Sequence, residues 1–199
     1  ERPVMRGTAQ NPDVYFQGRE TVTPYYDRLP TIVAETIEAL GERTGRRYSL
    51  FEYQGHPEAE RVAVLMGSAA ETFRETALHL ASGGDRCGVV HVRLCLPFSA
   101  PHFLAALPPT VRAIAVLDRT KAPGSTGEPL YADVVTTLAE ASARGALPFA
   151  MPRIVGGRYG LGSKELTPAM AKAVLDTLRA PTPKHPFTIG IDDDVSHTS

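Results

Sequence analysis

The sequence predicts a three-layer α/β fold, in which helices cover both faces of a mainly parallel sheet. Short apolar runs such as residues 61–67 and 87–96 are almost continuously hydrophobic, as strands buried on both faces are. Segments with helical spacing of apolar residues separate these runs, so that strands and helices alternate along the chain. An alternating order of this kind is typical of a parallel sheet between two layers of helices.

The first part of the chain precedes this alternation. Residues 1–26 have neither helical nor strand periodicity, and we expect them to be irregular. A helix is expected to begin at Asp27, which can cap it, with Pro30 in the first turn, where a missing N–H does no harm. Gly45 suits the left-handed conformation that ends many helices. The apolar residues of this helix fall on one face: Leu29, Ile32, Val33, Ile37 and Leu40.

From residue 48 onward the predicted strands and helices alternate. Strands are expected at 48–53, 61–67, 87–96, 111–117, 153–155 and 187–191. Helices are expected at 70–81, 101–107, 131–144 and 167–178. Ser68 and Thr167 are suitable helix caps, and Gly83 follows the first of these helices as a stop. Three prolines between residues 181 and 186 predict a stiff linker before the last strand.

The composition limits the class of protein. A chain of 199 residues is expected to form one domain with an extension, or two small domains. A hydrophobic content of 43% is ordinary for a globular protein, and a net charge of −1 argues against a broad nucleic-acid-binding surface. No run is long enough for a transmembrane segment, and no signal peptide is visible at the first residues. We therefore expect a cytoplasmic protein with neither nucleic-acid nor membrane partners.

The chain contains two cysteines, Cys87 and Cys95. They are expected at opposite ends of one strand, about 26 Å apart, which is too far for a disulfide or a shared metal site. We therefore expect two free, buried thiols, which suit the cytoplasm. Two cysteines cannot supply the ligands of an iron–sulfur cluster.

Residues 6–20 form a polar run that contains two aromatic residues. Its polar side chains, Arg6, Gln10, Asn11 and Asp13 among them, need partners if the run is to stay fixed. Two interpretations remain open: a hydrogen-bonded structural connection, or a bridge to neighbouring domains near an active-site cleft. Because the chain begins at Glu1 rather than Met, we expect the run to belong to a larger protein that holds its partners.

Residues 156–164 are rich in glycine, follow a predicted strand and precede a helix, which is the context of a phosphate-binding loop. The spacing of the glycines matches neither the Walker A loop nor the Rossmann fingerprint. We therefore favour a loop that allows close backbone approach. Arg158 and Lys164 remain available to acidic residues or to a phosphate across a domain boundary.

Residues 117–131 leave the carboxyl end of the third buried strand, where open α/β sheets place ligand sites. Asp118, Arg119, Lys121 and Glu128 could form an ion network there. Glu128 would also gain from the dipole at the start of the following helix.

No metal site or familiar catalytic motif emerges from the sequence. The acidic residues 192–194 could bind a divalent cation, but consecutive side chains of an extended chain point in different directions. A solvated or arginine-paired junction is therefore favoured. The histidines lack ligand spacing, and no nucleophile elbow of the type Gly-x-Ser-x-Gly occurs.

Several long and compositionally unusual segments resemble those of the pyruvate:ferredoxin (flavodoxin) oxidoreductases. They lie at 6–17 (RGTAQNPDVYFQ), 25–27, 111–121 (VRAIAVLDRTK), 127–131, 156–165 (GGRYGLGSKE) and 193–198, and the resemblance covers nearly all of the chain in order. It implies that residues 1–46 are the end of a pyrimidine-binding domain plus a linker helix. Residues 47–199 would then be a domain that resembles the C-terminal domain of transketolases.

The resemblance also implies the chemistry of a parent enzyme. That enzyme would decarboxylate pyruvate with thiamine diphosphate and Mg, pass electrons through 4Fe–4S clusters to ferredoxin or flavodoxin, and transfer the acyl group to coenzyme A. It would be a homodimer. The thiamine-binding pattern Gly-Asp-Gly followed by Asn-Asn is absent here, so this chain is expected to bind no cofactor, to carry no catalytic residue and to be inactive alone.

The resemblance makes the chain an architectural part whose loops serve interfaces rather than catalysis. The candidate interface or cleft residues are Arg6, Gln10, Asn11, Asp13, Asp118, Arg119, Glu128, Arg158 and Lys164. Two alternatives remain: a non-catalytic α/β interaction module, and a related enzyme that acts on another 2-oxoacid or uses NADP as the electron acceptor.

Overall fold

A computed structural model of the chain describes residue 7 and residues 9–192. The chain divides into two compact units, Glu1–Arg47 and Tyr48–Ser199, and each is described by itself. Within the described residues, no helix has both the length and the apolar character needed to cross a membrane.

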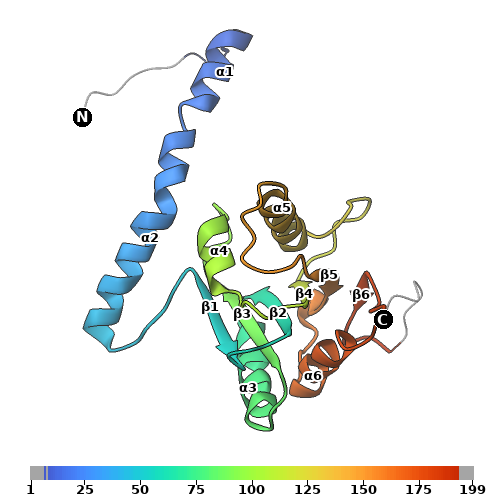
Figure 1. Ribbon diagram of the computed structural model, residues 1–199. Helices are drawn as coiled ribbons and strands as arrows, with labels where there is room; N and C mark the ends of the chain where they lie inside the picture. Colours follow the sequence, from blue (N-terminus) through green and yellow to red (C-terminus); the bar gives the residue numbers. More distant parts are fainter. Residues whose placement is uncertain (1–6, 8, 193–199) are drawn as a thin grey trace. The chain divides into compact units, whose positions relative to one another are not determined.

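The first unit contains two helices, α1 (Pro12–Glu20) and α2 (Thr23–Thr44) (Figure 1). The expectation that this stretch is irregular up to residue 26 is therefore wrong for the part that the structure describes. Asn11 caps α1 by accepting a hydrogen bond from the Val14 N–H at 2.9 Å, and Pro12 occupies the first turn. None of the residues of α1 is buried, so the helix has no apolar periodicity by which the sequence could reveal it.

Helix α2 begins earlier than predicted, because Pro24 rather than Pro30 occupies its first turn. Asp27 is therefore not its cap, and Pro30 lies inside the helix. The predicted end is confirmed: Gly45 adopts a left-handed conformation with φ of 70°, and its N–H donates to the Gly41 carbonyl at 2.8 Å.

The second unit is a six-stranded sheet with strand order β1-β3-β2-β4-β5-β6. Its strands are β1 (Phe51–Gly55), β2 (Arg61–Met66), β3 (Cys87–Val92), β4 (Ala113–Asp118), β5 (Arg153–Arg158) and β6 (Phe187–Thr188). Its helices are α3 (Ala69–Ser82), α4 (Ala100–Ala106), α5 (Pro129–Ala143) and α6 (Pro168–Thr177), with a short 3-10 helix at Leu161–Ser163. All the strand pairs are parallel except β1 with β3.

Two layers of helices cover this sheet, α3 and α6 on one face and α4 and α5 on the other (Figure 1). Every residue of β4 is buried, as are the first five of β2, because these central strands have helices on both sides. Phe73 of α3 and Phe103 of α4 are both completely buried, one in each layer. The predicted three-layer, mainly parallel α/β fold is therefore confirmed.

All six strands differ from their predicted bounds by one residue or more, β1 included, which spans Phe51–Gly55 rather than residues 48–53. β3 ends at Val92 rather than at residue 96, because its pairing with both neighbouring strands ends there. Val92 pairs with Phe51, the first residue of the antiparallel β1, and with Met66, the last residue of the parallel β2. β5 continues to Arg158, since its two glycines pair with β4 although glycine is a poor strand former. β6 is only two residues long.

The predictions about the helix caps and about the cysteines are confirmed only in part. Ser68 precedes α3, but its side chain makes no capping hydrogen bond, whereas the Thr167 hydroxyl accepts one from the Met170 N–H at 3.3 Å. Cys87 is buried at the start of β3, and Cys95 lies beyond the end of that strand and is half-buried. Both thiols are free, as predicted.

Candidate functional site

A cavity of about 130 Å³ lies at the carboxyl ends of β4 and β5. The loop from Arg119 to Glu128 encloses it, together with the first residues of α5, the glycines of β5 and the segment at His185. This is the edge at which parallel sheets present their connecting loops and place their ligands. The cavity therefore lies beside residues 117–131, the segment that was expected at this edge of the sheet.

Asp118 is the last residue of β4, and its carboxylate lies at the amino end of α5. One carboxylate oxygen accepts a hydrogen bond from the Leu130 N–H at 3.0 Å, and the other accepts from the Tyr131 N–H at 3.1 Å. These amides belong to the first turn of the helix, where they have no intrahelical partner. Burial raises the pKa of Asp118, while the two amide hydrogen bonds act in the opposite direction.

Glu128 and Arg158 form a buried ion pair beside Asp118. Their side chains are only 8% and 11% exposed, so water screens the two charges little. Arg158 is the last residue of β5, and Glu128 occupies the position directly before α5. The pair therefore joins the end of a strand to the start of a helix.

Tyr131 and His185 form the wall of the cavity next to this pair, and their rings lie with centroids 5.3 Å apart. A Cβ on Gly127 would lie 2.3 Å from the Tyr131 ring, and one on Gly156 would lie 3.0 Å from it. The ring therefore needs glycine on both sides. The Gly156 N–H donates to Nδ1 of His185 at 3.0 Å, which leaves Nε2 as the protonated nitrogen of the neutral ring.

The predicted ion network between Asp118, Arg119, Lys121 and Glu128 is wrong. No ion pair within the described part of the chain joins two of these four side chains. Asp118 binds backbone amides, Glu128 pairs with Arg158, and Arg119 donates to the Gly160 carbonyl at 2.9 Å. Three of the candidate residues, Asp118, Glu128 and Arg158, nevertheless meet at one cavity.

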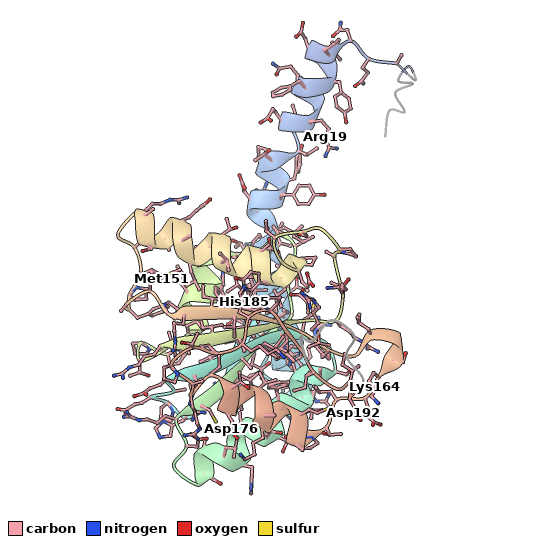
Figure 2. All side chains as sticks on the ribbon, turned by 90° about the vertical axis from the view of Figure 1, so that its right-hand side faces the viewer. Arg19, Met151, Lys164, Asp176, His185 and Asp192 are labelled. Carbon is pink, nitrogen blue, oxygen red and sulfur yellow. The ribbon has the colours of Figure 1, made fainter. Side chains whose placement is uncertain are left out.

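The glycine-rich segment at 156–164 is not a single loop. Its first three residues belong to β5, and α6 begins only at Pro168. The close approach expected of it is present, since a Cβ on Gly157 would lie 2.3 Å from the Phe187 ring. Lys164 is exposed after the 3-10 helix and lies apart from His185, which is close to α5 (Figure 2).

The remaining candidate residues belong to the first unit or lie outside the described residues. Gln10 and Asp13 are exposed, and Asn11 has a local role as the cap of α1. Arg6, and Asp193 and Asp194 of the acidic triplet, lie outside the described residues. Within the described chain, no three side chains of the types His, Cys, Asp and Glu come together as a metal site requires.

No sequence motif indicated His185 at this cavity. Its position depends on the path of residues 181–186 past the end of β5, and the only pattern there was a group of prolines. The polar groups at the cavity serve mainly one another: amides hold Asp118, Arg158 holds Glu128, and Gly156 orients His185. The arrangement can fix a loop and a helix terminus on the sheet.

Comparison with known proteins gives consistent results. A family model described as "Pyruvate:ferredoxin oxidoreductase core domain II" matches residues 59–160, which include Asp118, Glu128 and Arg158. Over 199 residues the chain is 59% identical to the pyruvate-flavodoxin oxidoreductase of Trichormus variabilis and 57% identical to the pyruvate:ferredoxin oxidoreductase of Moorella thermoacetica. It is 56% identical to the pyruvate-flavodoxin oxidoreductase of Rhodospirillum rubrum over an alignment of 200 residues.

Each of these alignments includes the whole of this chain but only 16% or 17% of the relative. The chain therefore spans about one sixth of the length of these relatives. The matched family model covers just over half of the chain, from β2 to the end of β5. The chain belongs to the pyruvate:ferredoxin oxidoreductase core domain II family.

Proposed function

We propose that this chain is one part of a thiamine-diphosphate-dependent pyruvate:ferredoxin (flavodoxin) oxidoreductase. The observation that carries the proposal is the 59% identity over the whole chain to an enzyme of which it spans 16%. The parent enzyme would oxidatively decarboxylate pyruvate, transfer the acyl group to coenzyme A and reduce ferredoxin or flavodoxin.

The role of this chain would be architectural. Thiamine diphosphate, when bound, supplies the decarboxylation chemistry, and the clusters carry electrons, but the donor sets here fit neither the Mg ion nor a cluster. Two cysteines cannot hold a 4Fe–4S cluster, and no metal-binding group occurs in the described part of the chain. The contacts that are present hold a loop and a helix terminus, which supports a structural role.

In this proposal the first 46 residues are the tail of a pyrimidine-binding domain with its linker helix, and residues 47–199 are a domain resembling the C-terminal domain of transketolases. Arg6, Gln10, Asn11 and Asp13 would face neighbouring domains of the parent. The loop after β4 and the segment after β5 would face the dimer partner through the exposed Arg119 and Lys164, while the largely buried Asp118, Glu128 and Arg158 would hold these segments in place. The exposed positions of Gln10, Asp13 and Lys164 support this assignment, because they leave these side chains available for other domains.

The parent would be a cytoplasmic homodimer. Its small-molecule and protein partners would be coenzyme A and ferredoxin or flavodoxin. Two free cysteines support the cytoplasmic location, and the names of the relatives support ferredoxin or flavodoxin as a partner.

An anaerobic assay of pyruvate-dependent dye reduction, with thiamine diphosphate, Mg and coenzyme A added, tests the proposal. We expect the 199-residue chain alone to give no reduction and the full-length parent to give turnover with pyruvate. The same parent with 2-oxoglutarate in place of pyruvate is the control for substrate class. Dye reduction by the chain alone, or a parent that uses 2-oxoglutarate and rejects pyruvate, would contradict the proposal.

A further inference from the structure

The amino edge of the sheet carries a second concave surface, of about 490 Å³. We call it the arginine basin, because five arginines line it: Arg61, Arg86, Arg112, Arg153 and Arg179. The acidic residues among its lining residues are Glu60 and Asp85, and Glu58 and Asp176 pair with Arg86 and Arg179 beside it, so five positive charges against four negative charges leave +1. The whole chain has a net charge of −1, so this surplus is local.

The topology brings four of these arginines together. β2 begins with Arg61 and β5 begins with Arg153, while Arg86 and Arg112 directly precede β3 and β4. Parallel strands begin at the same edge of a sheet, with about 4.8 Å between neighbours. Four guanidinium groups from four adjacent strands therefore converge on one side of the molecule. This edge lies opposite the cavity at the carboxyl ends of β4 and β5.

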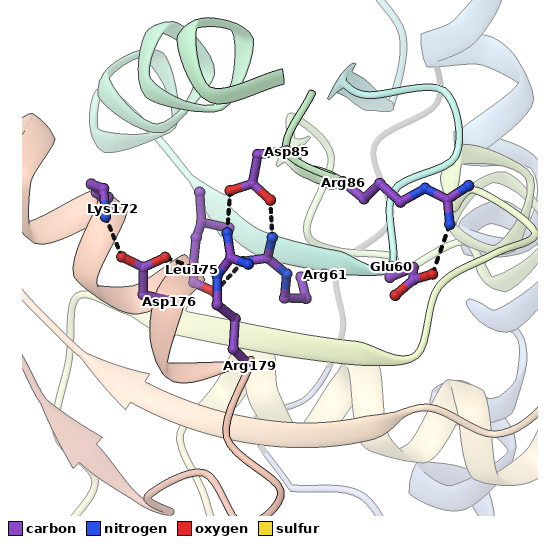
Figure 3. A network of polar contacts seen from close by, with 8 residues as sticks. All are labelled: Glu60, Arg61, Asp85, Arg86, Lys172, Leu175, Asp176 and Arg179. Atoms are coloured by element: carbon purple, nitrogen blue, oxygen red, sulfur yellow. Dashed lines mark hydrogen bonds and ion pairs between the residues drawn. The ribbon is translucent and has the colours of Figure 1, made fainter. Parts of the chain in front are cut away.

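Part of this charge is neutralised by neighbouring groups in the fold. Asp85 uses one carboxylate oxygen for Arg61 and the other for Arg179, as Figure 3 shows. Arg61 also donates to the Leu175 carbonyl at 2.9 Å, near the end of α6. Arg86 pairs with Glu60 at 3.0 Å and also with Glu58. These contacts account for Arg61, Arg86 and Arg179 as structural groups.

Arg112 and Arg153 are different. Arg153 donates only to backbone carbonyls at the end of α6, those of Leu178 at 3.3 Å, Ala180 at 3.0 Å and Pro181. The nearest carboxylate oxygen to Arg112 belongs to Glu60 at 4.0 Å, and the Arg112 side chain is 77% exposed. That same oxygen already accepts a hydrogen bond from Arg86. In the described part of the chain, neither arginine has a carboxylate of its own.

These two arginines are also neighbours. The Arg153 N–H donates to the Arg112 carbonyl at 2.9 Å, so the two residues lie side by side where the adjacent strands β4 and β5 begin. Planar guanidinium groups bind phosphate oxygens through paired, charge-assisted hydrogen bonds. A diphosphate group presents two linked phosphoryl groups, one for each guanidinium. A hollow of about 490 Å³ is also within the size range of small-molecule sites, whereas a protein partner needs a broad contact area.

We propose that the arginine basin binds a small molecule that carries a diphosphate group, with Arg112 and Arg153 as the principal ligands of the phosphoryl oxygens. Arg86 and Arg179 line the same hollow, but carboxylates pair with both, so they shape its wall. The site is separate from the cavity at the opposite edge of the sheet. It is also independent of the proposed oxidoreductase function, because its test measures binding by the chain alone.

Isothermal titration calorimetry of the 199-residue chain with sodium pyrophosphate tests the proposal, with orthophosphate as comparator at matched ionic strength. We expect pyrophosphate to bind at least about tenfold more tightly than orthophosphate, because one charge-assisted contact is worth about that factor. Arg112→Gln should weaken pyrophosphate binding by about tenfold or more for the same reason. Since Arg112 is exposed, this variant is expected to fold, and circular dichroism checks it.

Arg144→Gln is the matched control. Arg144 is 72% exposed, pairs with Glu140 at the end of α5 and does not line the basin. We expect this variant to bind pyrophosphate within about twofold of the unmodified chain. Three results would overturn the proposal: no pyrophosphate binding above matched salt, equal affinity for the two anions, or equal losses in the Arg112 and Arg144 variants. The absence of pyrophosphate binding is also the result expected if the basin docks an acidic protein segment instead.

Discussion

Asp118 illustrates at the level of one residue how the candidate site is built. Its carboxylate is buried, with the residue only 4% exposed, and both oxygens accept hydrogen bonds from the first turn of α5. Burial raises its pKa, yet the amides and the helix dipole favour the charged form. A charge that caps a helix in this way is satisfied within the fold. Asp118 is therefore a positioning group for α5 and the loop that encloses the cavity.

Cys87 gives a prediction about pH at the same scale. The residue is completely buried, and burial raises the pKa of its thiol from 9.0 to about 11, with a smaller contribution from the nearby Asp85. Between these two values the unfolded thiol ionises while the folded one stays protonated. Stability that is fully present below pH 9 is therefore lost as the pH rises towards 11. We expect the free energy of unfolding to fall by up to about 2–3 kcal/mol over this interval.

Urea denaturation at several pH values between 9 and 11, under reducing conditions, measures this loss. Cys87→Ala should flatten the pH dependence, whereas Cys95→Ala should leave most of it, because Cys95 lies beyond β3 and is only half-buried. Equal slopes for the unmodified chain and the Cys87 variant would show that this thiol does not control the alkaline stability.

The secondary-structure elements differ in how well the sequence predicts them. β2 and β4 were predictable because helices bury them on both faces, which imposes a continuous apolar run. The end of α2 was predictable from Gly45, whose left-handed conformation favours glycine. Helix α1 was not predictable, because it buries no residue and so carries no apolar pattern. The end of β3 depends on where β1 and β2 stop, which no local pattern records.

The same distinction applies to the candidate site. Asp118 and Glu128 could be assigned to the carboxyl end of a strand and the start of a helix, because both positions follow from local sequence. The pairing of Glu128 with Arg158 could not be predicted from the sequence, since it requires β5 to lie beside β4 and to extend through two glycines. His185 depends on a still longer path around the sheet. Register and crossover paths are non-local, and one sequence reveals them poorly.

A prediction at this scale concerns the start of α1. Asn11→Ala removes the side chain that accepts the Val14 N–H, and loss of such a cap costs about 1 kcal/mol of helix stability. Hydrogen exchange of the α1 amides should therefore be faster in Asn11→Ala, by about fivefold, than in the unmodified chain. Asn11→Asp keeps a capping oxygen and is the control. If both variants exchange alike, the side chain of Asn11 serves something other than the helix cap.

At the scale of the whole chain, the two edges of the sheet have different characters. The carboxyl edge of β4 and β5 holds a small cavity whose polar groups are occupied by one another. The amino edge holds a larger hollow in which Arg112 shares the Glu60 carboxylate with Arg86 and Arg153 donates to backbone carbonyls. Charges that the fold has already paired stabilise it, whereas unpaired charges at a concave surface are available to a ligand. The two edges are therefore suited to structure and to binding, respectively.

The last prediction compares the two units of the chain. Neither α1, with nine residues, nor α2, with 22 residues, contains a buried residue, whereas all six residues of β4 are buried. Helices draw most of their stability from packing, and those shorter than about 12–15 residues are marginal in water. In the 199-residue chain alone, we expect the amides of α1 and α2 to exchange with solvent at least about 100-fold faster than those of β4.

Hydrogen exchange read by mass spectrometry, at a concentration where the chain is monomeric, measures this difference. Exposed aromatic residues on these helices, including Phe16 at 66% and Tyr25 at 73%, are the positions that other domains of the proposed parent would cover. The same amides should therefore be protected in the full-length enzyme, while the β4 amides serve as an internal control in both samples. Equal protection of α2 and β4 in the monomeric chain would mean that α2 is stable without those domains, and the role proposed for it as a linker awaiting partners would fail.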